Sequence, residues 1–259
     1  MAAVTPSPSA TGTGTGRART TVRTAVVWDY LRAALDELAD GRSLEVLDVG
    51  GGSGGFAVPV AQLGHRVTVV DPSPDALAAL ERRAAETDTA DRVRGRQGDA
   101  AGVLDLVSAG SVDVVLCHSV LEVVDDPAEA LGALAAALRP GGIASVLAAS
   151  RVAAVVARAS AGRLGEARQI LDDPAGRAGE HDPLARRFTL DELQTLLAAT
   201  GLRSRTVHGA RIFADAVPAP TLDTDPQAVD DLLALERAAA ERPDYLAVAT
   251  LLHVLAERD

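Results

Sequence analysis

The chain has 259 residues, of which 47% are hydrophobic, and a formal net charge of −11 at pH 7. This length and composition predict one large domain, or one domain with an elaboration. The acidic balance argues against a broad nucleic-acid surface, so no DNA partner is expected, although a local basic pocket stays compatible with it. No uncharged apolar stretch is long enough to span a bilayer, so no membrane span is expected.

Two residue types exclude several kinds of site. All 25 basic residues are arginine, which excludes a Schiff-base enzyme, a P-loop nucleotide site and a lysine base. The single cysteine, Cys117, excludes an internal disulfide and a multi-cysteine zinc site, and no metal site is expected. We interpret this thiol as buried and inert, and we expect a reducing, cytoplasmic location. Aromatic residues make up only 2% of the chain, so few side chains could stack on nucleic-acid bases.

The first residues are interpreted as a tail. Residues 1–20 are rich in Ser, Thr, Pro and Gly and contain no acidic residue. They lack the apolar core of a secretory signal, and they loosely fit a transit peptide, but we favour a disordered tail. The folded domain is then expected over residues 21–259.

From residue 21 to residue 149, helical and strand-like patterns alternate. Apolar residues recur at helical spacing over 21–39, and Gly41 is a natural stop. Strands that alternate with helices at this spacing predict a parallel, doubly wound α/β sheet with right-handed crossovers. The predicted strands cover 44–49, 66–71, 93–99, 112–119 and 143–149, and the predicted helices cover 56–64, 73–86 and 126–142, the last closed by a Pro-Gly-Gly turn.

The pattern changes after residue 150. Residues 151–187 are charged, helical in character and interrupted by Gly and Pro, which predicts a helical cap inserted into the domain. A helix is predicted over 189–201, a strand over 202–209, a helix over 225–245 that ends before Pro243, and a final strand over 247–257.

A glycine-rich loop indicates where a ligand binds. Five glycines fall within residues 50–55, directly after the first predicted strand. Such a loop is typical of nucleotide-type sites, because its N–H groups and the following helix N-terminus favour an anionic group. Asp71 and Asp99 follow the next two strands, at the edge where open α/β sheets bind ligands, and an acid at position 71 can accept both ribose hydroxyls.

Other interpretations of these residues stay open. Asp71 could be a strand-end cap and Asp99 a solvated loop acid. Gly50, Gly52 and Gly55 also satisfy the G-x-G-x-x-G pattern, so an NAD-type oxidoreductase stays possible in principle, as does a non-catalytic cofactor-binding protein.

The combination of motifs resembles class I S-adenosylmethionine-dependent methyltransferases. The resemblance rests on DVGGGSG over 48–54, on Asp71 and Asp99, and on LRPGG over 138–142. It implies a Rossmann-like sheet of seven strands whose last strand is antiparallel, S-adenosyl-L-methionine as the cofactor, and transfer of a methyl group by in-line SN2 displacement to an oxygen or nitrogen acceptor.

Within that group the chain resembles the tRNA wobble 5-carboxymethoxyuridine methyltransferases, which esterify the carboxylate of the nucleotide. The segments that carry this likeness cover 22–31, 46–54, 117–127, 209–215 and 232–258. The resemblance implies that Arg23 reaches the carboxylate of the cofactor, that Gly50 and Gly51 pass beneath its methionine part, that Asp71 holds its ribose, and that His118 lies beside it. The full set of expected cofactor-binding residues is Arg23, Asp48, Gly50, Gly51, Gly52, Asp71, Asp99 and His118.

The substrate is predicted less sharply than the cofactor. The segments over 148–156 and 176–188 depart from the family pattern, and these regions should contact substrate. Two hypotheses therefore remain, a modified-tRNA substrate and a small-molecule substrate. A carboxylate acceptor needs no general base, whereas a phenol or an amine does. The sequence offers no compelling base, and we favour a cofactor contact for His118 over a catalytic role.

Overall fold

The computed structural model describes residues 13–259, without the side chains of 13–21, 219, 223, 224 and 226. Residues 1–12 of the tail predicted over 1–20 lie outside the described residues. The first helix, α1 (Thr13–Ala39), begins before the predicted residue 21 and ends where the sequence predicted. Among residues 13–259, no helix combines the length and the apolar character needed to cross a membrane.

Seven strands form one sheet, in the order β3-β2-β1-β4-β5-β7-β6. β1 to β5 pair in parallel, whereas β7 runs antiparallel to both β5 and β6. This arrangement confirms the predicted doubly wound α/β sheet with an antiparallel last strand. The strands are β1 (Glu45–Val49), β2 (Arg66–Asp71), β3 (Val93–Gln97), β4 (Val112–His118), β5 (Leu138–Ala149), β6 (Leu202–Ala210) and β7 (Leu251–Arg258).

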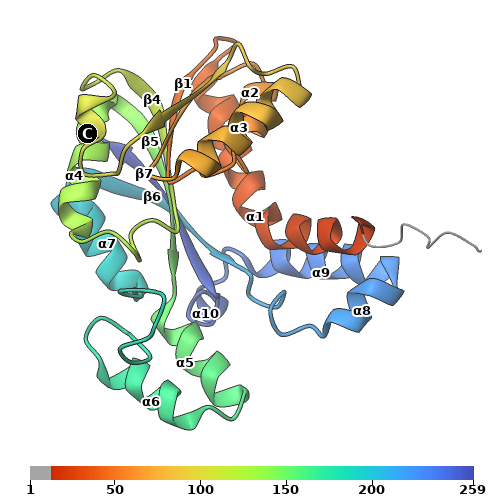
Figure 1. The fold of residues 1–259 in the computed structure, drawn as a ribbon. Coiled ribbons are helices and arrows are strands. Elements are labelled where there is room, and N and C mark those ends of the chain that lie inside the picture. The colour runs from red at the N-terminus through yellow and green to blue at the C-terminus, as the bar shows by residue number, and fades with distance from the viewer. Residues whose placement is uncertain (1–12) are drawn as a thin grey trace, which may run out of the picture.

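Helices cover both faces of the sheet (Figure 1). α1, α2 (Ala57–Gln62) and α3 (Pro74–Glu86) lie on one face, and α4 (Pro127–Ala137) and α7 (Leu190–Ala199) lie on the other. A short 3₁₀ helix over Val103–Asp105 precedes β4. α3 and α7 each begin with a side-chain cap. The side chain of Ser73 accepts from the N–H of Ala76, and Thr189 forms a capping box with Glu192.

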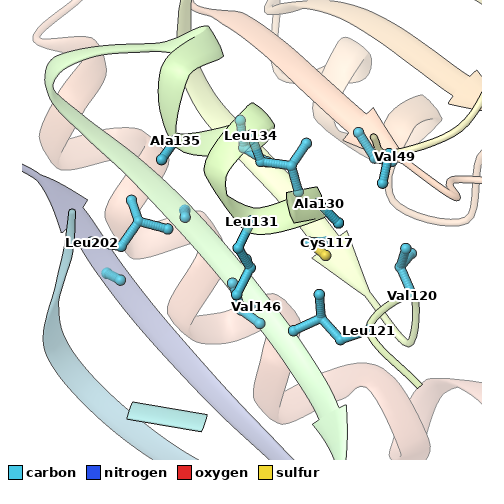
Figure 2. Close-up of a cluster of buried hydrophobic side chains, with 14 of the residues drawn as sticks. Val49, Cys117, Val120, Leu121, Ala130, Leu131, Leu134, Ala135, Val146 and Leu202 are labelled. Carbon is cyan, nitrogen blue, oxygen red and sulfur yellow. The ribbon is translucent and has the colours of Figure 1, made fainter. Parts of the chain in front are cut away.

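The core is divided by the sheet because side chains alternate along each strand. In β4, Val114 and Leu116 pack with the α1–α3 side, while Val115 and Cys117 pack with the α4 side. Figure 2 shows Cys117 on the α4 side of the sheet, in one cluster with Leu131 of α4 and Val146 of β5. Burial raises the pKa of this thiol far above its usual value, so the thiolate does not form. This confirms that Cys117 is buried and inert.

Some element boundaries differ from the prediction. α4 ends at Ala137, and the Pro-Gly-Gly segment predicted to close it lies inside β5. The pairing of β4 with β5 shifts register between Val112 and Val114, and Gly141 has φ +75°. The strand therefore passes through a bulge, which a left-handed glycine tolerates, instead of starting after a separate turn.

The segment after β5 also differs in detail. The range 151–187 contains α5 (Arg151–Ser160) and α6 (Leu164–Asp172), which lie beyond the carboxyl edge of the sheet (Figure 1). The helical pattern ends at Asp172, and an irregular stretch follows that contains a buried ion pair of 2.6 Å between Arg187 and Asp182. Arg187 and two backbone N–H groups lower the pKa of Asp182 to about 2, against the effect of its burial.

The helical region before the last strand consists of three helices. α8 (Ala219–Thr224) has no counterpart in the sequence prediction. α9 (Pro226–Ala239) and α10 (Pro243–Leu246) replace the single helix predicted over 225–245. Pro243 occupies the first turn of α10, where a missing N–H costs little, so it starts a helix instead of only ending one.

Candidate functional site

The glycine loop after β1 is needed for both its conformation and its lack of side chains. Gly50 and Gly52 have φ values of +67° and +55°, in the left-handed region that favours glycine. A Cβ on Gly50 would lie 2.5 Å from Cγ2 of Val120, and one on Gly51 would lie 2.4 Å from Oδ2 of Asp48. The loop is therefore packed closely against Asp48 of β1 and against Val120, which follows β4. Its backbone lines the two cavities described next.

The first cavity lies between the ends of β1, β2 and β3 and has a volume of about 480 Å³. Asp71 lines it, and its two carboxylate oxygens accept from the N–H groups of Gly52 and Ser73, at 2.9 Å each. Each oxygen keeps a further lone pair, so the carboxylate can still accept from a ligand. Asp99 lines the same cavity and accepts from the N–H of Gly102 at 2.8 Å.

The second cavity lies on the other side of the loop and has a volume of about 420 Å³. Gly50 and Ser119 line both cavities, so the two spaces meet at these residues. The second cavity is lined by Arg23, Thr24, Val27, Asp48, Gly51, Gly55, Phe56, His118, Leu147, Arg211 and Leu251. Seven of the eight residues expected to bind cofactor therefore line the two cavities, and the eighth, Gly52, holds Asp71 in place.

Asp48 is a buried acid at the bottom of the second cavity. Its side chain is 3% exposed, and Oδ2 has no hydrogen-bond partner among the residues that the structure describes. Burial, and then the nearby charge of Asp71, raise its pKa to about 7. A cation bound next to this carboxyl would lower its pKa again and favour the ionised form. The site therefore suits a positively charged ligand group.

His118 ends β4 and connects the second cavity to the interior of the sheet. Its Nε2 lies 2.8 Å from Oγ of Ser145, which lies 2.9 Å from Nε2 of His253, and Nδ1 of His253 lies 3.1 Å from Nδ1 of His208. Burial lowers the pKa of His118 to about 4, so the ring is neutral at physiological pH. The hydrogen bond to Ser145 fixes the orientation of the ring against the cavity.

Arg23 reaches the second cavity from α1. Its Nη2 donates to Oδ1 of Asp215 at 3.0 Å, and its side chain is about half exposed. The helix thus places one guanidinium at the cavity, as expected, although the structure gives it a carboxylate partner from the loop after β6.

Residues 47–144 match a family model described as a methyltransferase domain. The match covers β1 to the start of β5, which contains the glycine loop, Asp71, Asp99 and His118. Over these residues the chain is similar to methyltransferase domains. This similarity favours the methyltransferase interpretation over the NAD-type alternative left open by the glycine spacing.

Known methyltransferases resemble the chain in sequence over about half of its length. It is 34% identical over 126 residues to the tRNA 5-carboxymethoxyuridine methyltransferase of Escherichia coli K12. The aligned region covers 49% of this chain and 48% of that protein. It is 37% identical over 119 residues to a ubiquinone biosynthesis O-methyltransferase of Caulobacter vibrioides, which covers 46% of each. The chain thus spans about half the length of the curated relatives it matches.

The fold is similar to that of solved methyltransferases over most of the chain. The crystal structure of magnesium protoporphyrin IX methyltransferase from Synechocystis PCC 6803, with bound SAH, covers 97% of this chain and 90% of its own, with a TM-score of 0.62 and 16% identity. At this level of identity the similarity supports the fold alone.

Sequence reasoning missed several residues that line the second cavity. Phe56 contacts the His118 ring edge-on, with ring centroids 4.6 Å apart. Ser119 adopts φ +56°, an uncommon conformation for a non-glycine residue, which turns the chain sharply between the two cavities. Leu147 and Leu251 supply apolar walls from β5 and β7. Nothing in the local sequence around these residues signals a ligand, because their positions depend on which strands are neighbours.

Proposed function

We propose that the protein transfers a methyl group from S-adenosyl-L-methionine to an oxygen or nitrogen atom of an acceptor. The observation that carries this proposal is the pair of cavities that meet at Gly50 and Ser119, one with Asp71 and the other with Asp48, Arg23 and His118. This division matches the chemistry of the cofactor, which joins a nucleoside to a charged amino acid.

The residues present fit the cofactor. Asp71 carries free lone pairs for a ribose diol, and Asp99 lines the same cavity, where the base would lie. In the second cavity, the unpartnered Oδ2 of Asp48 suits an ammonium group, and Arg23 suits a carboxylate. Gly51 passes between these groups and leaves the space that a side chain would fill.

The reaction needs positioning more than acid or base assistance. When bound, the sulfonium of the cofactor supplies a methyl group that is already activated for attack by a nucleophile. The protein's contribution is to hold the two reactants in line and to exclude water. Holding two reactants in the correct geometry is a large source of rate enhancement for such a transfer. Phe56, Leu147 and Leu251 form an apolar wall suited to that role. His118 lines the same cavity, and its Nδ1 has no hydrogen-bond partner among the described residues, so the neutral ring keeps one nitrogen for a ligand.

Two classes of acceptor are supported by different observations. The similarity to a tRNA 5-carboxymethoxyuridine methyltransferase favours a carboxylate on a tRNA nucleotide. The similarity to ubiquinone biosynthesis O-methyltransferases, together with the net charge of −11, favours a small molecule.

The cofactor is tested by isothermal titration with S-adenosylhomocysteine, with NAD as the comparison ligand. We expect micromolar binding of the first and none of the second, and the absence of binding by S-adenosylhomocysteine would reject the proposal. The acceptor is then sought with radiolabelled S-adenosylmethionine and an extract of a strain that lacks this gene, separated into RNA, protein and small molecules. Label in RNA supports the tRNA hypothesis, and label in the small-molecule fraction supports the other.

A further inference from the structure

Two arginines face the second cavity and share one carboxylate. Nη2 of Arg23 lies 3.0 Å from Oδ1 of Asp215, and Nη2 of Arg211 lies 2.6 Å from Oδ2 of the same group. Arg211 directly follows β6 and lines the same cavity as Gly50 and Gly51 of the glycine loop. The proposed cofactor brings a single carboxylate, which Arg23 can bind, so one cation is left without a role.

Among the described residues, only one of the two donors along one edge of the Arg211 guanidinium is paired. In an arginine, Nε and Nη2 donate in parallel along one edge, which matches the two oxygens of a carboxylate. Nη2 of Arg211 bonds Asp215, whereas its Nε is buried and has no hydrogen-bond partner within residues 13–259. A carboxylate that lay along this edge would satisfy both donors at once, which Asp215 does not do.

The backbone around Arg211 is held in an uncommon conformation by buried contacts. Arg211 has φ +58°, a costly value for a residue with a side chain. The loop that follows is fixed by Glu236 of α9, which is fully buried and accepts from the N–H groups of residues 212–214 at 3.0, 2.8 and 2.7 Å. Before it, Gly209 donates to the carbonyl of Ala240 at 2.7 Å. Strain that is held by so many contacts is typical of a residue with a functional position.

We propose that Arg211 determines acceptor specificity by binding a carboxylate of the methyl acceptor, with Asp215 as its partner while the acceptor is absent. The proposal rests on the proposed methyltransferase function and deepens it. It applies equally to a carboxylate on a tRNA nucleotide and to a small carboxylic acid, because the chemistry of recognition is the same. On binding, the acceptor replaces Asp215 along the Nε–Nη2 edge, and no covalent bond of the protein changes.

The test separates acceptor binding from cofactor binding. The probes are S-adenosylhomocysteine, measured by titration calorimetry, and the RNA and small-molecule fractions of the deletion-strain extract, assayed with radiolabelled S-adenosylmethionine. For Arg211→Gln we expect the half-saturating amount of the active fraction to rise about tenfold or more, with the Kd for S-adenosylhomocysteine within about threefold of the wild type. Arg211→Lys should recover part of the loss, because it keeps the charge but not the paired donors.

Control variants distinguish a binding role from a structural ion pair. Arg23→Gln should weaken S-adenosylhomocysteine binding instead. Arg203→Gln is the matched control, because Arg203 lies in β6, pairs with Glu257 and does not line the cavity; this variant should behave as the wild type. Asp215→Ala breaks the same ion pair from the other side. If Arg211 binds the acceptor, this variant should keep or lower the half-saturating amount, because it removes the competing carboxylate.

The outcomes that overturn the inference are distinct from failure of the proposed function. If Arg211→Gln and Asp215→Ala impair labelling alike, or if Arg211→Gln weakens only the cofactor, Arg211 does not bind the acceptor. The same conclusion follows if the active fraction keeps its labelling after carbodiimide and ethanolamine have converted its carboxylates to neutral amides. Failure of the proposed function itself would appear earlier, as a wild-type protein that neither binds S-adenosylhomocysteine nor transfers label.

Discussion

At the scale of single residues, the site combines two kinds of requirement. Gly50 must adopt a left-handed conformation and also leave room for Val120. Asp48 is buried, and its Oδ2 has no hydrogen-bond partner among the described residues. The first requirement is steric and the second is electrostatic, and each leads to a separate prediction.

Replacing Gly50 by alanine should destabilise the fold and abolish cofactor binding. The new Cβ would lie 2.5 Å from Val120 and at φ +67°, which together should lower the free energy of unfolding by about 2–4 kcal/mol. Gly55→Ala is the matched control, because nothing lies within 4 Å of its added Cβ and its φ is not positive. Urea denaturation measures both variants, and equal stability of the two would contradict the steric argument.

Asp48→Asn should change how stability depends on pH. The folded-state pKa of Asp48 is raised to about 7, above the usual 3.8 of an aspartic acid. The wild type therefore keeps the associated stability below pH 4 and loses it as the pH rises through about 7, where the buried carboxyl ionises. The asparagine variant lacks this loss, so it should be more stable than the wild type by up to about 4 kcal/mol at pH 8.5 and no more stable at pH 4.

Calorimetric or denaturant midpoints of the two proteins across this pH range check the expectation. The same variant should bind S-adenosylhomocysteine about tenfold more weakly at pH 8, since it cannot provide a charge for the ammonium group. A stability difference that does not depend on pH would show that Asp48 does not titrate near neutrality.

At the scale of elements, the second cavity depends on helices that are distant in sequence from the glycine loop. α9 packs against α1, where Arg237 pairs with Asp29 at 2.7 Å, and it fixes the loop of Arg211 through Glu236. The packing of α9 against α1 thus supports both arginines of the cavity, Arg23 on α1 and Arg211 in the loop after β6 (Figure 1).

Removing Glu236 should release that loop. Glu236→Ala leaves three backbone N–H groups without their acceptor, which should cost about 2–3 kcal/mol of folding free energy. It should also raise the half-saturating amount of acceptor, as Arg211→Gln does, because Arg211 is no longer held. Asp231→Ala on the exposed face of α9 is the control and should change neither quantity. A destabilised variant with unchanged acceptor response would separate Glu236 from the site.

The comparison of sequence and structure is also clearest for elements. β2, a continuous apolar and β-branched run, was predicted residue for residue, because hydrophobic periodicity and the flanking turn residues agree there. The Pro-Gly-Gly segment was assigned to a turn because these residues usually terminate elements, but pairing of Leu138 with Val112 extends β5 through it. Local preference was overridden by a neighbouring strand whose position the local sequence does not specify.

At the scale of the whole molecule, ligand binding should stabilise the entire chain, because the proposed cofactor site is lined by residues from α1 and from the ends of β1, β2 and β4. A ligand at 100 times its Kd adds about 2.7 kcal/mol to the free energy of unfolding. For a chain of this size, that corresponds to a rise in Tm of roughly 5–10 °C.

Saturating S-adenosylhomocysteine should therefore raise the Tm by this amount, whereas NAD should leave it unchanged. Asp71→Asn should lose most of the shift, and Asp75→Asn, an exposed acid in the first turn of α3, should retain it. Differential scanning fluorimetry gives all of these values. A shift with NAD, or an undiminished shift in the Asp71 variant, would contradict the assigned site.

The sequence by itself determined the doubly wound sheet, the glycine loop, and the acids at the ends of β1 to β3. These features are local, since a strand, its turn and its cap are encoded within a few neighbouring residues. Only the tertiary structure decided that Ser119 joins two cavities, that Glu236 fixes the loop of Arg211, and that Asp215 is shared by two arginines. These contacts join residues that are up to 192 positions apart, and such pairings follow from how strands and helices pack, which local patterns do not contain.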